Sequence, residues 1–160
     1  MAISLLVADD HQLIREGLCA ILERESDRFK ILGQASDGRS IVALAAKLNP
    51  DIVLMDIGMP ELNGLDATRQ IVELGNSSRI IAVSMHRERQ YVQGILKAGA
   101  SGYLLKNSAC EELIQAVCTV AEGHVYLSPQ IGASVIEGLR VGQGDDRSEE
   151  HTSELQSHLN

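Results

Sequence analysis

Residues 51–56 read DIVLMD, a short run that is apolar at its four inner positions and ends in an aspartate. Four other strand-sized runs rich in Ile, Val and Leu recur along the chain, at residues 3–8, 30–35, 79–84 and 101–105. Strands that are apolar at nearly every position are typical of a parallel sheet whose two faces are both covered. These runs therefore predict five buried parallel strands.

The segments between these runs have the length and the apolar period of helices. Apolar residues recur in the first segment at Leu13, Gly17, Leu18, Ile21 and Leu22, and in the second at Ile41, Leu44, Ala45 and Leu48. Proline disfavours helix in the residue before it, so Asn49-Pro50 predicts the end of the second helix. Ser108 and Glu111 have the spacing of a capping box at the start of the last helix. Because strands and helices alternate, the sequence predicts a doubly wound α/β domain of βα units with right-handed crossovers.

The composition fits one folded domain in the cytoplasm. The chain has 160 residues, of which 44 % are hydrophobic and 22 % are charged, and these values exclude disorder of the whole chain. No apolar run approaches the roughly 18 residues that span a bilayer, and the first residues lack the basic start of a signal peptide. Cys19, Cys110 and Cys118 have no metal-ligand spacing, so we expect reduced thiols and no zinc.

Three segments are predicted along the chain. Residues 1–122 form the α/β domain, residues 123–144 form a linker with a short helix that starts near Pro129, and residues 145–160 form a disordered tail. The string RSEEHTSELQSH at 147–158 resembles the translation of a sequencing-library adapter. This predicts an artefactual tail and a missing natural C-terminus, and a natural polar tail is the alternative.

The charge balance argues against a nucleic-acid surface. The net charge is −8, and five acids and one base lie in the last 16 residues, which leaves 17 acids and 13 bases for the rest. A DNA-binding surface needs clustered Lys and Arg and a basic pI. We therefore expect no direct DNA binding by these residues.

Polar side chains follow the predicted strands at the edge where functional groups of open parallel sheets gather. They are Asp9, Asp10, Asp56, Ser84 and Lys106. Three carboxylates at one edge repel one another unless a cation neutralises them, and oxygen ligands favour Mg²⁺. An aspartate can then act as a nucleophile that accepts a phosphoryl group, while a lysine and a hydroxyl neutralise and bind the phosphoryl oxygens.

Four motifs resemble those of the receiver domain of bacterial two-component response regulators. They are the Asp9-Asp10 pair, LMDIGMPELNG around Asp56, AVSMH around Ser84 and GASGYLLK ending at Lys106, and the resemblance covers about residues 3–122. VSMH, AGASGYLLK and HVYLSP resemble the NarL/FixJ subfamily, whose members normally carry a C-terminal LuxR-type helix-turn-helix. The resemblance implies a flavodoxin-like (CheY-like) (βα)5 fold with strand order 2-1-3-4-5.

The resemblance also implies the chemistry of individual residues. Asp56 would accept a phosphoryl group from a sensor histidine kinase. Asp10, Asp56 and the Gly58 carbonyl would bind Mg²⁺ directly, and Asp9 would assist, often through water. The domain would catalyse only its own phosphorylation and dephosphorylation, so we do not expect an enzyme acting on other substrates.

A second set of residues would bind the phosphoryl group and change conformation in response to it. Ser84 and Lys106 would be the switch hydroxyl and the phosphate-binding lysine, and Tyr103 falls at the aromatic switch position. Phosphorylation would draw Ser84 toward the site and vacate space into which Tyr103 turns. The alternative for Tyr103 is simple packing with its hydroxyl at the surface. Gly58 and His86 flank the site and would tune dephosphorylation, with surface or turn roles as the alternative.

The loop after Asp56 is explained by backbone geometry. Pro60, which follows Met59, fixes φ, and Gly64 is expected to adopt a positive φ. These residues would shape the loop rather than react.

Several functions remain open at this stage. The leading hypothesis is the receiver part of a transcription regulator that dimerises when phosphorylated and binds DNA only through a missing C-terminal domain. A stand-alone receiver that passes or absorbs phosphoryl groups is the alternative. A haloacid dehalogenase-type phosphatase is disfavoured. That family has the motif D-x-D-x-T, with a second aspartate two residues after the nucleophile, whereas here Gly58 stands two residues after Asp56. A Rossmann nucleotide site is disfavoured because acids stand where a glycine-rich loop is needed.

Overall fold

The computed structural model describes residues 2–108 and 110–143. Its strands are β1 (Ile3–Ala8), β2 (Phe29–Ala35), β3 (Ile52–Asp56), β4 (Arg79–Ser84), β5 (Gly102–Leu105) and β6 (Tyr126–Leu127). Its helices are α1 (Gln12–Glu23), α2 (Gly38–Leu48), α3 (Gly64–Glu73), α4 (Arg89–Lys97), α5 (Cys110–Ala121) and α6 (Pro129–Gln143). The five predicted strands are all present, with bounds within one residue of those expected. None of the helices in this described part of the chain is both long and apolar enough to cross a membrane.

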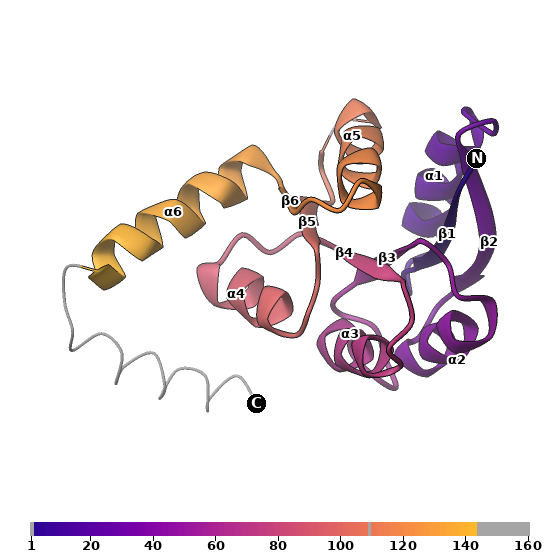
Figure 1. Cartoon of the computed structure of the whole chain (residues 1–160), viewed down its shortest axis with the longest axis horizontal. Coiled ribbons are helices and arrows are strands. Elements are labelled where there is room, and N and C mark those ends of the chain that lie inside the picture. The colour runs from indigo at the N-terminus through magenta and orange to yellow at the C-terminus, as the bar shows by residue number, and fades with distance from the viewer. Residues whose placement is uncertain (1, 109, 144–160) are drawn as a thin grey trace.

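The strands form one parallel sheet in the order β2-β1-β3-β4-β5-β6. The first five follow the predicted order 2-1-3-4-5, so the doubly wound fold is confirmed, with one strand added at the edge. Figure 1 shows α1 and α5 on one side of the sheet and α2, α3 and α4 on the other. Strand order reverses between β1 and β3, and open parallel sheets bind their ligands at the carboxyl ends of the strands beside such a reversal.

Side chains of each strand alternate between the two faces of the sheet and build two apolar cores. Along β1, Leu6 and Ala8 belong to the core that includes α2, α3 and α4, whereas Leu5 and Val7 belong to the core that includes α1 and α5. All four residues are at most 2 % exposed. Burial on both faces accounts for the consecutive apolar residues, and it leaves polar groups to the strand ends.

The boundaries of α2 follow from local hydrogen bonds. The Asp37 side chain accepts a hydrogen bond from the Ser40 amide at 2.8 Å, which caps the start of the helix. At the other end Asn49 adopts a left-handed conformation with φ 44°, and its amide donates to the Ala45 carbonyl. The predicted end before Pro50 is thus confirmed. Ala109, before α5, lies outside the described residues, and the capping box there stays a prediction.

The chain after residue 122 continues the sheet and the core. β6 pairs in parallel with β5, and α6 then begins at Pro129 as expected but extends for 15 residues. Ile131 of α6 is 1 % exposed. The predicted linker therefore contains a strand and a docked helix, because two strand residues give too little alternation to be recognised in a sequence. The predicted tail, residues 145–160, lies outside the described residues.

Ile131→Ala tests how firmly α6 belongs to the domain. Truncating a buried isoleucine leaves a cavity, so we expect the free energy of unfolding to fall by about 2 to 5 kcal/mol. Ile136 lies on the same helix with 57 % exposure, and Ile136→Ala should change that value by less than about 0.5 kcal/mol. Urea unfolding measures both variants. Equally small effects would show that α6 adds nothing to stability.

Candidate functional site

The predicted site residues lie at the carboxyl ends of four neighbouring strands. Asp9 and Asp10 directly follow β1, Asp56 and Ser84 end β3 and β4, and Lys106 directly follows β5. Since β1, β3, β4 and β5 are adjacent in the sheet, all five side chains start from one edge. This is the place at which sheets with such a reversal in strand order bind their ligands.

Lys106 links two buried carboxylates. Its Nζ lies 3.1 Å from Asp9 Oδ2 and 3.1 Å from Asp56 Oδ1. The Lys106, Asp9 and Asp56 side chains are 8 %, 1 % and 7 % exposed, so water screens these charges weakly. Burial by itself would lower the pKa of Lys106, but the charge of Asp56 and hydrogen bonds to Asp56 and Asp9 outweigh it and raise that pKa. Lys106 is therefore a cation at neutral pH.

Asp56 is held in an environment that disfavours its charge. Burial and the charge of Asp9 raise the pKa of the Asp56 carboxyl, and Lys106 opposes them only in part. Two carboxylates thus share one ammonium in a buried site. A further positive group near Asp56, such as a bound divalent cation, relieves this imbalance.

His11 completes the acidic cluster, and the sequence prediction did not include it. Its Nδ1 lies 3.0 Å from Asp10 Oδ1 and 3.2 Å from Asp9 Oδ1, while its backbone N–H donates to Asp9 Oδ1 at 2.8 Å. The ring is largely exposed, whereas Asp9 is buried. The sequence shows only that a histidine directly follows the acid pair. Whether its ring contacts that pair depends on the conformation of the turn after β1, which the sequence pattern does not reveal.

The donor atoms at this edge fit a divalent cation. One ligand atom each from Asp9, Asp10, His11 and Asp56 can be chosen so that all lie within 4.8 Å of one another. Asp9 Oδ2 is buried and has no hydrogen-bond partner of good geometry beyond its ion pair with Lys106. Carboxylate oxygens are the ligands of hard cations such as Mg²⁺. The Gly58 amide donates to Asp56 Oδ1 at 3.4 Å, so this loop lies beside the cluster.

The loop after β3 is held against Asp56 by its backbone. The Gly64 amide donates to the Ile57 carbonyl at 2.8 Å, and a Cβ at Gly64 would overlap the carbonyl oxygen of Asp56. The expected positive φ at Gly64 is wrong, because the positive φ of this loop, 70°, belongs to Glu61. Glycine is needed at 64 for close approach of two backbone segments rather than for a left-handed turn.

Ser84 and Tyr103 meet at the backbone of His86. The His86 amide donates to Ser84 Oγ at 3.0 Å, and the Tyr103 hydroxyl donates to the His86 carbonyl at 2.9 Å. Tyr103 is completely buried, so its hydroxyl is not at the surface as the packing alternative required. Burial also raises the pKa of Tyr103. The predicted switch hydroxyl and switch aromatic thus share one residue of the loop after β4.

The His86 ring lies on the surface of this loop. It stacks on Tyr91 with ring centroids 4.5 Å apart and an interplanar angle of 19°, and its Nδ1 lies 3.5 Å from Glu88 Oε2. These contacts explain the ring's orientation by packing. An effect on dephosphorylation stays a prediction.

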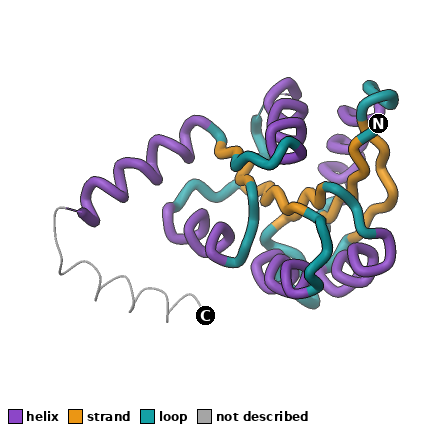
Figure 2. Tube along the Cα trace, in the orientation of Figure 1, coloured by secondary structure: helices purple, strands orange, loops and turns teal. Residues whose placement is uncertain are grey.

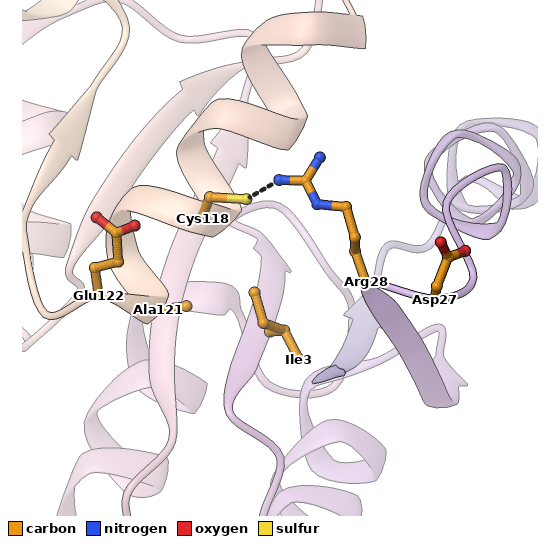
Figure 3. A pocket seen from close by; sticks show the side chains of 6 residues that line it. All are labelled: Ile3, Asp27, Arg28, Cys118, Ala121 and Glu122. Atoms are coloured by element: carbon orange, nitrogen blue, oxygen red, sulfur yellow. Dashed lines mark hydrogen bonds between the residues drawn. The ribbon is translucent and has the colours of Figure 1, made fainter. Parts of the chain in front are cut away.

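A cavity of about 410 Å³ lies away from this cluster. Its lining is Ile3, Asp27, Arg28, Cys118, Ala121 and Glu122, and Arg28 Nη2 donates to Cys118 Sγ at 2.9 Å (Figure 3). Ile3 begins β1, whereas the acidic cluster follows the end of that strand. The cavity therefore lies at the amino-terminal end of β1, opposite the carboxyl ends of the strands, and shares no residue with the candidate site.

The comparison with known families decides the assignment. The family model of the response regulator receiver domain matches residues 5–118, which is more than half of the chain. The chain belongs to the response regulator receiver domain family. This family consists of phosphoacceptor signalling domains. The family match therefore confirms the prediction, made from the sequence motifs, of a response regulator receiver.

The relatives of this receiver domain place it among NarL/LuxR-type regulators. It is 40 % identical over 147 residues to the transcriptional regulatory protein DegU of Brevibacillus brevis, covering 92 % of this chain and 62 % of that protein. It is 36 % identical over 138 residues to the transcriptional regulatory protein LiaR of Bacillus subtilis, covering 86 % and 65 %. The chain thus spans about three fifths of the length of these curated relatives.

Solved structures agree with the fold and the subfamily. A LuxR-family two-component response regulator from Aurantimonas sp. SI85-9A1 superposes with a TM-score of 0.82 at 33 % identity, covering 88 % of this chain and 99 % of that one. The receiver domain of the putative response regulator NarL from Mycobacterium tuberculosis gives 0.74 at 32 % identity, covering 77 % and 98 %. Both matches support the predicted NarL-type receiver.

Asp56→Asn tests the charge imbalance of the receiver's site. A carboxyl whose pKa is raised by folding costs stability when it is ionised, so at pH 7 the variant should unfold at a temperature about 3 to 6 °C higher, which corresponds to about 1 kcal/mol. The advantage should shrink as the pH falls through the raised pKa of Asp56 and vanish below the unfolded value of about 3.9. Thermal unfolding without Mg²⁺ at several pH values measures it. A less stable variant at pH 7 would contradict the imbalance.

Proposed function

We propose that this receiver accepts a phosphoryl group on Asp56 from a sensor histidine kinase with the help of Mg²⁺, in the cytoplasm. The observation that supports it best is the buried Lys106 ammonium 3.1 Å from Asp56, beside a cluster of further carboxylates. Asp9, Asp10, Asp56 and the Gly58 carbonyl are the proposed Mg²⁺ ligands. His11 hydrogen-bonds Asp9, and its Nδ1 also lies 3.0 Å from Asp10 Oδ1, so the ring helps to orient the acid pair.

Asp56 is the proposed nucleophile. One of its carboxylate oxygens forms a bond to phosphorus while the bond between phosphorus and the kinase's histidine nitrogen, or the oxygen of a small phosphodonor, breaks. The product is an acyl phosphate, and the electron pair leaves with the donor. Mg²⁺ when bound supplies neutralisation of the phosphoryl oxygens. Lys106 adds a second positive charge from within the protein, which stabilises the same oxygens.

Ser84 and Tyr103 are the residues proposed to change conformation in response to this reaction. The Ser84 hydroxyl donates to a phosphoryl oxygen, which draws the end of β4 and the following loop toward Asp56. Tyr103 is already turned inward here and is held by the His86 carbonyl of that loop. Phosphorylation therefore favours the arrangement in which this loop and Tyr103 are held together.

Gly58 and His86 are proposed to tune the lifetime of the acyl phosphate. A Cβ at Gly58 would meet no other atom within 4 Å, so this position leaves open space beside Asp56. Water can reach the phosphorus atom through such space. A larger side chain at 58 would obstruct it and lengthen the lifetime.

In the longer protein we propose transcription control through a C-terminal LuxR-type helix-turn-helix, with a second copy of the receiver as a partner after phosphorylation. The relatives named above are transcriptional regulators, and the present chain spans about three fifths of their length. A stand-alone receiver is the alternative, because the charge of these residues suits no DNA surface. Genomic sequence beyond codon 144 distinguishes the two.

Asp56→Ala tests the phosphoacceptor. Incubation of the full chain with acetyl phosphate and Mg²⁺ should give a single phosphoryl adduct by intact-mass spectrometry, and EDTA or the substitution should abolish it. Lys106→Ala should slow the reaction by about 10²-fold, since it removes a preorganised charge. Lys47→Ala removes an exposed lysine of α2 and should react like the wild type. An adduct that persists in Asp56→Ala would refute the assignment.

Asp10→Asn tests the metal ligands. A cation that binds only the folded state stabilises it, by about 1.4 kcal/mol at tenfold excess over the dissociation constant. Mg²⁺ should therefore raise the unfolding temperature of the wild type, and this rise should be lost in Asp10→Asn. Asp27→Asn at the opposite edge of the sheet serves as the control. An equal rise in all three proteins would mean that Mg²⁺ does not bind at the acid pair.

A further inference from the structure

Ser128 joins the edge of the sheet to α6. It is completely buried, its backbone N–H donates to the Tyr103 carbonyl at 2.9 Å, and its Oγ accepts from the Leu105 amide at 3.1 Å. Its own carbonyl accepts from the amides of Ile131 and Gly132, both at 2.9 Å. Ser128 thus makes hydrogen bonds both to the backbone of β5 and within the first turn of α6.

The contacts of Ser128 reach the proposed switch directly. The Ser128 hydroxyl accepts a hydrogen bond from the amide of Leu105, which is the residue before Lys106. Tyr103, whose carbonyl accepts from Ser128, carries the hydroxyl that bonds His86. The residues next to Lys106 on β5 are therefore linked by hydrogen bonds, through Ser128, to the first turn of α6.

α6 returns to the same switch from the other side. Ile131 is buried in the core and Val135, four residues on, packs against it. At Gly138 a Cβ would overlap the end of the Arg89 side chain, so the helix lies close to the start of α4. Arg89 follows the loop that holds His86. Figures 1 and 2 show α6 leaving β6 at the sheet edge and extending past α4.

We propose that Ser128 is a positioning residue that couples the phosphoacceptor site to the docking of α6 on α4, and that this helix carries the signal to the chain beyond residue 143. The proposal rests on the proposed function. A closed path of hydrogen bonds and packing supports it, from β5 through Ser128 to α6, α4, His86 and Tyr103. Tyr103 is inward and α6 is docked in the same structure, so phosphorylation should tighten the docking.

Hydrogen exchange of the full chain, with and without beryllium trifluoride and Mg²⁺ as phosphoryl analogue, tests this coupling. In the wild type, exchange of the amides at 131–138 should slow by about fivefold or more on loading, the lower end of the coupling between linked sites. Ser128→Ala should still form the acetyl phosphate adduct but lose the slowing. Ser134→Ala, on the same helix, should keep it, and Ser128→Thr, which retains a hydroxyl, should restore it.

A second variant leaves Ser128 intact. Val135→Asp places a charge where α6 packs against the core, which loosens the docking of the helix. Because coupling between two equilibria is reciprocal, this variant should bind beryllium trifluoride about fivefold more weakly than the wild type. This readout holds even if Ser128→Ala fails to fold.

The outcomes separate the two proposals. A wild type that forms no adduct refutes the proposed function and the coupling with it. A wild type that forms the adduct but shows unchanged exchange in α6 leaves the function standing and refutes the coupling. Slowing that survives in Ser128→Ala, or unaltered binding in Val135→Asp, would likewise refute it.

Discussion

The ammonium group of Lys106 lies between two buried carboxylates, and the arrangement of the sheet is what makes this possible. A lysine this buried is stable as a cation only beside negative charge, and Asp9 and Asp56 provide it from β1 and β3. These strands are neighbours in the sheet while β5 lies two positions away from β3. The long lysine side chain spans that distance along the carboxyl edge. The ion pairs thus depend on the strand order β1-β3-β4-β5 of the folded sheet.

This arrangement leaves more negative than positive charge around Asp56, and the imbalance is the basis of the proposed chemistry. Asp10 and His11 extend the cluster toward solvent, whereas Asp9 is enclosed. A structural ion pair would normally match its charges, because unpaired buried charge is costly. Excess carboxylates around a single lysine are instead typical of a site that binds a cation, and that cation together with Lys106 can then neutralise the oxygens of a phosphoryl group.

The apolar pattern predicted the sheet and the site residues because both depend on short-range sequence features. A strand buried on both faces is apolar throughout, as in residues 51–56, and the first polar residue after it is placed at the sheet edge by that fact alone. His11, β6 and Ser128 have no such pattern in the sequence. The His11 bond to the acid pair depends on a turn, β6 has two residues, and Ser128 looks like an ordinary serine before a proline. The requirement for glycine at 64 was misjudged for the same reason, since the overlap with Asp56 exists only in the folded loop.

The most direct measurement is the position of the acceptor itself. Borohydride reduces an acyl phosphate and releases the phosphate, which converts the aspartate that carried it to homoserine. Peptide mapping after treatment with acetyl phosphate, Mg²⁺ and borohydride should find this conversion at Asp56 alone. Conversion at Asp9 or Asp10, or at no aspartate in a folded protein that has formed an adduct, would contradict the assignment of Asp56 as the nucleophile.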